Sequence, residues 1–175
     1  MSLLNILRFI KYKIIKTNLF VFFLISIFMT LLAERLPMWL YYYKNWMYKE
    51  RKWEDGGRIY ERLFFVRKWK CRLPEISEFL KWRFSKKHLT EKNNPAYLTK
   101  FLVESCKSEF THWMIILSTI LFIFWSDLYT MSRTMMLALI LNIPYIIIQR
   151  YNRPRIIKLI QKNDVEHYEL SPVKA

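Results

Sequence analysis

The chain has 175 residues, enough for one domain, and its 29 basic and 14 acidic residues give a net charge of +15. Hydrophobic residues make up 53 % of the chain, aromatic residues 18 % and charged residues 25 %, and only two glycines are present. This combination excludes an ordinary soluble basic domain and a fully embedded membrane protein, disfavours nucleic acid as the partner, and indicates a small protein lying partly in a bilayer and partly against its anionic surface.

The N-terminal part predicts a membrane-associated helix. Residues 3–16 alternate apolar side chains with four basic ones, a pattern typical of an amphipathic helix at the interface. Residues 18–33 are apolar and uncharged, although 16 residues fall short of the ~20 that a full span needs. A signal peptide, a re-entrant hairpin broken at residues 34–37 and a spanning segment remain alternatives, and a spanning segment is preferred.

Residues 34–94 form a basic, aromatic region that we expect in the cytoplasm or at the interface. Asp55-Gly56-Gly57 marks a turn. Residues 64–74 (FFVRKWKCRLP) fit either a short strand, as part of a strand pair, or a helix. Residues 75–89 place apolar side chains at helical spacing, which predicts an interfacial helix with a basic outer face.

The C-terminal half predicts a transmembrane hairpin of two helices, residues 95–125 and 134–150, followed by a basic and polar tail at 156–175. Asn94-Pro95 is a typical helix start, and residues 126–133 form a polar break. Pro144 predicts a kink in the second helix. The open end of the hairpin carries more basic residues than the closed end, so we expect it to be cytoplasmic in a multi-pass protein. The predicted fold is therefore a mainly α, small integral membrane protein with added interfacial helices.

Two polar stretches fall at the open end of this hairpin: residues 104–113 (ESCKSEFTHW) and 142–155 (NIPYIIIQRYNRPR). An antiparallel hairpin centred near residue 130 puts His112 at the depth of Gln149. Arg150, Arg153 and Arg155 form a guanidinium cluster suited to phosphate or carboxylate. It remains open whether they bind a substrate or only anchor anionic lipid headgroups.

These stretches, together with ERLP at 34–37 and FFVRKWK at 64–70, resemble the glycosyl-4,4'-diaponeurosporenoate acyltransferases. These are small bacterial membrane proteins that act last in staphyloxanthin biosynthesis. The resemblance covers residues 34–155, and its pattern has Glu at 104 and 109, His at 112 and Trp at 113 but does not require Cys106. It implies transfer of a fatty acyl group to the primary sugar hydroxyl of a glycosylated carotenoid in the bacterial cell membrane.

Such a transfer needs a base, donors for the tetrahedral oxyanion and sites for two substrates. We expect His112 to act as the base, with Glu109 or Glu104 fixing the imidazole tautomer. No metal or bound cofactor is expected, and acyl-CoA or an acyl carrier is expected as co-substrate. The residues expected to bind substrates or anions are Arg150, Arg153, Arg155, Gln149, Asn142, Asn152, Tyr151, Trp113, Arg67, Lys68 and Lys70.

Each assignment has a structural alternative. His112 at a helix boundary is equally compatible with a packing role, and Asn142 and Gln149 fit helix–helix hydrogen bonding as well as catalysis. The competing functions are a non-enzymatic membrane scaffold or accessory subunit that docks anionic lipid, and a different membrane enzyme acting on a lipid. GxSxG and GxGxxG motifs are absent, so a hydrolase or nucleotide-binding enzyme of the soluble type is disfavoured. The sequence leaves the oligomeric state open.

Overall fold

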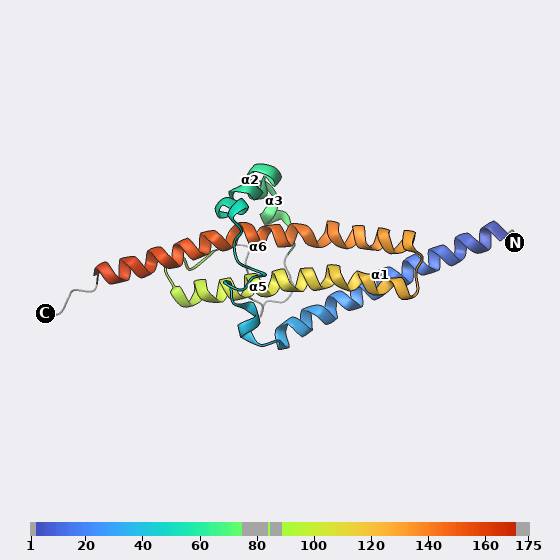
Figure 1. Cartoon of the computed structure of the whole chain (residues 1–175), viewed down its shortest axis with the longest axis horizontal. Coiled ribbons are helices and arrows are strands. Elements are labelled where there is room, and N and C mark those ends of the chain that lie inside the picture. Colours follow the sequence, from blue (N-terminus) through green and yellow to red (C-terminus); the bar gives the residue numbers. More distant parts are fainter. Residues whose placement is uncertain (1–2, 75–83, 85–88, 171–175) are drawn as a thin grey trace. The chain divides into compact units, whose positions relative to one another are not determined.

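The computed structural model describes residues 3–74, 84 and 89–170, and every regular element within them is a helix (Figure 1). The mainly α fold is therefore confirmed. The α-helices are α1 (Leu3–Arg35), α2 (Arg58–Phe64), α3 (Val66–Trp69), α5 (Pro95–Ser118) and α6 (Leu128–Leu170). The 3-10 helices are η1 (Met38–Tyr41), η2 (Lys52–Gly57), η3 (Lys70–Arg72) and η4 (Thr119–Phe124).

The chain divides into two compact units. Unit 1 consists of residues 1–36 and 110–146, and unit 2 consists of residues 37–109 and 147–175. Helices α5 and α6 each contribute one part to either unit. The two units are described separately below.

Side-chain caps explain where the long helices begin. Pro95 opens α5, and the Oδ1 atom of Asn94 accepts a hydrogen bond from the Tyr97 backbone N–H at 3.2 Å, which confirms the predicted start. Asp127 precedes α6, and its carboxylate accepts hydrogen bonds from the backbone N–H and the hydroxyl of Thr130 at 3.1 and 2.7 Å. The predicted break after residue 125 is thus a capped turn.

Within unit 1, Asn18 of α1 joins the turn between η4 and α6. Its side chain is 1 % exposed. The Nδ2 group donates to the Ser126 hydroxyl at 2.9 Å and lies 3.4 Å from the Thr134 hydroxyl oxygen, while Oδ1 accepts from the Trp125 indole N–H at 2.9 Å. Residues 1–36 belong to the same compact unit as the hairpin segments, and the part of α1 that follows Asn18 runs from this turn back along the hairpin (Figure 1).

The polarity of unit 1 is the reverse of that in a soluble protein. Polar side chains such as Asn18, Thr119 and Thr134 are buried, whereas Phe20, Phe23, Phe124 and Met136 are more than half exposed. Two helical stretches are long and apolar enough to cross a membrane, Ile15–Arg35 and Leu128–Asn163. A core helix of a soluble protein is mostly buried, but only 6 % and 22 % of their apolar windows are buried here.

Unit 2 contains a tight turn that connects η2 to α2. Asp55, Gly56 and Gly57 have φ angles of 50, 64 and 78°, so three consecutive residues adopt the left-handed conformation and confirm the predicted turn. A Cβ atom on Gly57 would lie 3.0 Å from the backbone oxygen of Tyr151. Gly57 is therefore required both for its φ angle and for the close approach of α6.

Several elements extend beyond their predicted bounds, and one open alternative is decided. Of the strand and the helix considered for residues 64–74, the structure has helices: α3 and η3 occupy this segment, with Phe65 at φ 50° separating α2 from α3. Residues 3–16 and 18–33 form one helix, and α6 continues to Leu170 through the predicted polar tail. α6 also continues past Pro144 without an interruption. The interfacial helix predicted for 75–89 lies outside the described residues, apart from positions 84 and 89.

Replacing Asn18 with Leu should destabilise unit 1. The substitution removes a buried amide that bonds three partners and leaves the Trp125 indole N–H without its acceptor, at a cost of about 1–3 kcal/mol. Thermal or denaturant unfolding of the protein in detergent measures the change. Thr17→Ala is the matched control, because the exposed Thr17 hydroxyl bonds only the carbonyl of Lys13 in its own helix. An equal stability for Asn18→Leu and Thr17→Ala would contradict this account of the turn.

Candidate active site

A buried ion-pair cluster in unit 2 is built around Glu109 of α5. The side chain is fully buried. Its Oε1 atom accepts a hydrogen bond from Arg150 Nε at 2.7 Å, and its Oε2 atom accepts one from Arg153 Nη2 at 2.6 Å. Both arginines belong to α6. Charge-assisted hydrogen bonds of this length are among the strongest polar contacts in proteins, so one carboxylate joins α5 to α6.

Glu54 of η2 supplies the second carboxylate of the cluster and is 2 % exposed. Its Oε1 atom accepts hydrogen bonds from Arg150 Nη1 at 3.0 Å and from the Tyr60 hydroxyl, and its Oε2 atom accepts one from the Arg51 backbone N–H at 2.5 Å. Burial and the hydrogen bond to Glu54 raise the pKa of Tyr60. Tyr60 therefore remains protonated and acts as a donor at neutral pH.

The remaining guanidinium donors bind the segment before η2. Arg150 Nη2 donates to the Met47 carbonyl at 2.5 Å, and Arg153 Nη1 donates to the Tyr48 carbonyl at 2.9 Å. The cluster thus holds residues 47–54 against α5 and α6 with two carboxylates and two guanidinium groups. In the part of the chain that the structure describes, the Tyr48 hydroxyl and Arg153 Nε are buried without a hydrogen-bond partner.

His112 lies in unit 1 and contacts two residues of α6. Its Nδ1 atom lies 2.7 Å from Asn142 Oδ1, and its ring stacks on that of Tyr145 at a centroid distance of 4.8 Å and an interplanar angle of 11°. The Asn142 Nδ2 group donates to the Ala138 carbonyl at 2.8 Å, which orients Oδ1 toward the imidazole. Because Oδ1 can only accept, Nδ1 carries the proton and the neutral ring has its lone pair on Nε2.

The two carboxylates proposed to orient His112 have other partners. Glu109 is ion-paired as described above, and Glu104 Oε1 binds Lys107 Nζ at 3.0 Å. Asn142 occupies the position on Nδ1 that the sequence led us to give to a carboxylate. Helix–helix hydrogen bonding and a catalytic role were the two alternatives for Asn142. The structure shows a hydrogen bond from α5 to α6, and this bond also orients a candidate catalytic base.

The other predicted residues have diverse surroundings. Asn152 accepts a hydrogen bond from Lys70 Nζ at 3.1 Å, and burial lowers the pKa of Lys70. Arg155 lies over the ring of the buried Tyr151 at 3.6 Å and donates to its backbone carbonyl. Gln149 is buried, Trp113 is half-buried, and Arg67 and Lys68 are exposed. Arg150 and Arg153 meet in one cluster, whereas Arg155 packs separately on Tyr151.

Cys106 is not suited to act as a nucleophile. Its thiol is fully buried, and burial raises its pKa to about 11, so the reactive thiolate is scarce at neutral pH. Cys71 is exposed, and both cysteines are free. The described residues hold no group of three or more His, Cys, Asp and Glu side chains that could bind a metal ion.

Sequence reasoning missed Glu54, Tyr48 and Tyr60. Glu54 directly precedes the Asp-Gly-Gly turn, but it is one of eight acidic residues between positions 34 and 94, and no local signal distinguishes it as the one with a buried partner. Nothing in the sequence links it to Arg150, 96 positions away.

Comparison with known proteins identifies the family. The family model described as glycosyl-4,4'-diaponeurosporenoate acyltransferase matches residues 44–162. The chain belongs to this acyltransferase family. It is 32 % identical over 130 residues to the protein of that name from Staphylococcus aureus strain N315, and 31 % identical over 130 residues to those of strains bovine RF122 / ET3-1 and USA300. Each match covers 74 % of this chain and 78 % of the relative. No solved structure matches the chain.

The resemblance inferred from the motifs is thereby confirmed, and the protein is an enzyme that transfers acyl groups. The matched region of this acyltransferase contains both clusters described above, since Glu54, Glu109, His112, Asn142 and Arg150 all lie between residues 44 and 162.

Replacing Glu109 with Gln should strongly destabilise the acyltransferase. The neutral amide leaves Arg153 as a buried cation without its carboxylate, and breaking a buried pair in this way costs about 3–5 kcal/mol. Denaturant unfolding of the protein in detergent gives the free-energy change. Asp55→Asn is the matched control, because it makes the same carboxylate-to-amide change in exposed ion pairs to Arg58 and Arg62 and should cost far less stability. Similar losses in the two variants would show that the cluster does not stabilise the fold.

Proposed function

We propose that the enzyme transfers a fatty acyl group to the primary hydroxyl of a sugar carried by a carotenoid or related isoprenoid lipid, with His112 as general base. The observation that carries the proposal is the hydrogen bond between His112 Nδ1 and Asn142 Oδ1, because it selects the tautomer that has its basic lone pair on Nε2. Stacking on Tyr145 further restrains the plane of the imidazole ring.

In this mechanism Nε2 of His112 removes the proton of the sugar hydroxyl while the hydroxyl oxygen attacks the acyl carbonyl carbon. The new C–O ester bond forms, and the tetrahedral intermediate then expels the carrier group of the donor. The imidazolium returns its proton to that leaving group, so the base is regenerated without net consumption of protons. A positioned base of this kind contributes roughly 10²–10⁴ to the rate. For a thioester donor, the leaving group is a thiol.

The acceptor is inferred from the relatives. Their name describes a glycosylated diaponeurosporenoate, a carotenoid acid that carries a sugar. The exposed apolar surface of α1 and α6 supports a lipid-borne acceptor for this chain, because an enzyme embedded in a bilayer meets its polyene substrate there. The last step of staphyloxanthin biosynthesis fits this reaction.

The buried contacts of Arg150 and Arg153 favour a positioning role over direct binding of donor phosphate. Each guanidinium is hydrogen-bonded to a carboxylate and to a backbone carbonyl of residues 47–48. We therefore assign these arginines to holding residues 47–54 in place. The oxyanion donor is not assigned to a residue.

His112→Ala should lower the rate of acyl transfer by about 10²–10⁴ while the protein stays in the membrane. Asn142→Ala should lower it by about tenfold, because one orienting hydrogen bond is lost, whereas Asn142→Asp should retain most activity, since a carboxylate also accepts from Nδ1–H. The ester formed from a glycosylated carotenoid acid is quantified by mass spectrometry in membranes containing each variant. The other histidines of the chain supply the matched controls His88→Ala and His167→Ala, which should behave as wild type. An active, normally inserted His112→Ala enzyme would remove the role given to His112.

The membrane orientation follows from unit 1 and from the distribution of charge. Because α1 runs from the turn at Ser126 back along the hairpin, its N-terminal end lies on the side of the hairpin's closed end. The closed-end side has four basic residues at 1–17 and one at 126–133, whereas the open-end side has four at 37–53, three at 92–109 and five at 150–162. We propose that α1 spans and that the open end is cytoplasmic.

Cysteine labelling should report this orientation. Cys71 is exposed and follows the open-end side of α1, so a membrane-impermeant thiol reagent should label it in inside-out vesicles and spare it in intact cells. Cys106 should remain unlabelled in both preparations until the protein is unfolded, because it is fully buried. A Cys71→Ser variant identifies the labelled site. Labelling of Cys71 in intact cells would reverse the proposed orientation.

A further inference from the structure

Two cavities in unit 2 are lined by none of the residues assigned to the chemistry of His112. The smaller has a volume of about 260 Å³ and the larger about 810 Å³. Tyr43 and Ile157 line both, so the cavities are neighbours with these two side chains between them. Apolar atoms form most of the surface of both, but six charged residues line the smaller cavity and none lines the larger, a difference that fits a ligand with one charged and one apolar part.

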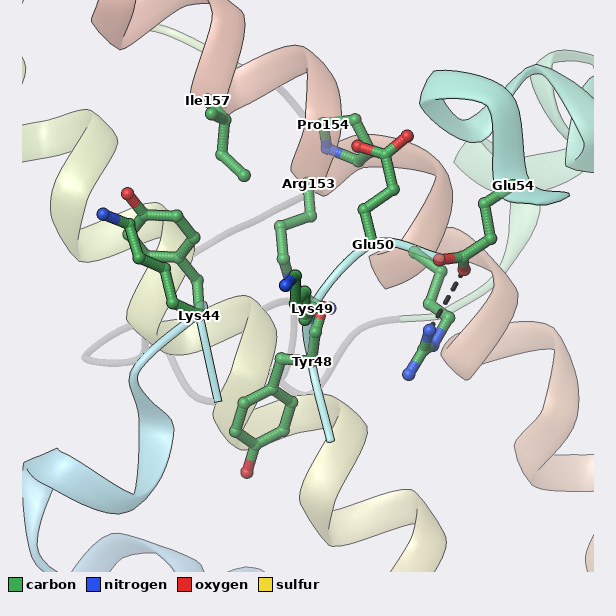
Figure 2. A pocket seen from close by; sticks show the side chains of 10 residues that line it. Lys44, Tyr48, Lys49, Glu50, Glu54, Arg153, Pro154 and Ile157 are labelled. Carbon is green, nitrogen blue, oxygen red and sulfur yellow. Dashed lines mark hydrogen bonds and ion pairs between the residues drawn. The ribbon is translucent and has the colours of Figure 1, made fainter. Parts of the chain in front are cut away.

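The smaller cavity is lined by charged side chains (Figure 2). The acidic residues are committed to other contacts, since Glu50 accepts a hydrogen bond from the Gly56 N–H at 2.6 Å and Glu54 belongs to the buried cluster. Arg150 and Arg153 are likewise paired. Lys44 and Lys49 also line the cavity, and neither forms an ion pair within the described part of the chain. With the carboxylate of Glu50, which accepts only from a neutral N–H in the contact above, the two lysines leave the lining a net positive charge.

Two side chains of this lining carry a buried polar atom without a hydrogen-bond partner among the described residues, the Tyr48 hydroxyl and Arg153 Nε. The Tyr48 hydroxyl points away from Arg153, Pro154 and Ile157 in Figure 2, so it does not contact a ligand in the smaller cavity. The charges of Lys44 and Lys49 are therefore the feature of this lining that fits an anionic ligand.

The larger cavity is lined mainly by apolar and aromatic side chains. Tyr41 is buried in its wall, and Leu102, Val103 and Ile160 contribute from α5 and α6. Met38 and Trp39 of η1 are 63 % and 72 % exposed. Large apolar side chains left exposed beside a cavity are typical of a site that meets lipid or an apolar ligand.

We propose that the two cavities form the acyl-donor site: the larger holds the fatty acyl chain, and the smaller holds the phosphate-bearing group that carries it. The proposal rests on the proposed acyl transfer and adds the substrate class and the residues that bind it. Lys44 and Lys49 supply charge-assisted contacts to phosphate. A volume of about 810 Å³ lies within the roughly 300–1,000 Å³ of ordinary ligand pockets and suits a flexible chain. A coenzyme A thioester and an anionic phospholipid both have this chemistry.

The experiment measures binding of a series of saturated acyl-CoAs, from four to ten carbons, to the full chain in nanodiscs by isothermal titration, with empty nanodiscs subtracted. Affinity should rise by up to about fourfold per methylene, the factor that corresponds to burial of one CH₂ from water. A parallel arm measures competition by phosphatidylglycerol nanodiscs against phosphatidylcholine nanodiscs, which distinguishes a phospholipid source from coenzyme A.

Paired variants test each cavity. Val103→Trp should fill the larger cavity and shorten the chain length at which affinity stops rising, whereas Leu63→Trp places the same ring at an exposed position of α2 that lines neither cavity. Lys49→Gln should weaken binding by about tenfold, whereas Lys52→Gln, outside both cavities, should not. Circular dichroism of each variant confirms that the fold is retained.

The outcomes separate this proposal from the proposed function. Binding that depends on chain length, and that changes in Val103→Trp and Lys49→Gln but not in their controls, supports the donor site. If such binding is found but no ester is formed, the proposed reaction is wrong and the donor site stands. Acyl transfer with an unchanged chain-length preference in Val103→Trp overturns the donor site and leaves the reaction in place. Affinity that does not depend on chain length, or that falls equally in the control variants, also overturns it.

Discussion

The structure of unit 2 depends on a carboxylate that bonds two arginines away from water. Glu109 is fully buried and holds Arg150 and Arg153 at 2.7 and 2.6 Å, and Arg150 extends the cluster to Glu54. Removing charges from water is costly, so such a cluster persists only when every charge has a partner of good geometry. Two carboxylates and two guanidinium groups meet this condition. The cluster fixes the position of residues 47–54 against α5 and α6, and this segment supplies part of the lining of the smaller cavity.

Unit 1 is stabilised differently, because its apolar surface is suited to a bilayer. Many of its large apolar side chains are exposed, and its interior includes polar contacts: Asn18 bonds the turn before α6, and Asn142 bonds His112. In a bilayer, apolar side chains gain nothing by packing together, so hydrogen bonds between helices supply much of the specificity. A buried asparagine without hydrogen-bond partners is costly, so its amide is held firmly where partners are present. Asn142 therefore both joins the two helices and fixes the orientation of the His112 imidazole.

The sequence predicted what short-range patterns determine. Asn94-Pro95 gave the start of α5, the glycine pair gave the turn at 55–57, and the long apolar runs gave the helices. It left two alternatives open where periodicity is ambiguous: the alternation at 64–74 fitted a strand or a helix, and the segment forms α3 and η3 after Phe65, which adopts the left-handed conformation. It failed where partners are distant in sequence. Glu109 and Arg150 were both recognised as candidate site residues, but not as partners in an ion pair. We also expected a glutamate partner for His112, whereas the structure gives it Asn142. Both contacts depend on side-chain geometry, which residue spacing does not determine.

The central claim is that His112, held in one tautomer by Asn142, removes the proton of the sugar hydroxyl. The most direct test is the pH dependence of single-turnover acyl transfer. A histidine base works only when neutral, so the rate should fall with unit slope as the pH drops through the imidazole titration and should level off at higher pH. In Asn142→Asp the added carboxylate stabilises the imidazolium, which should move this fall to higher pH. A rate that does not change with pH across this range, or a profile identical in wild type and Asn142→Asp, would contradict the account.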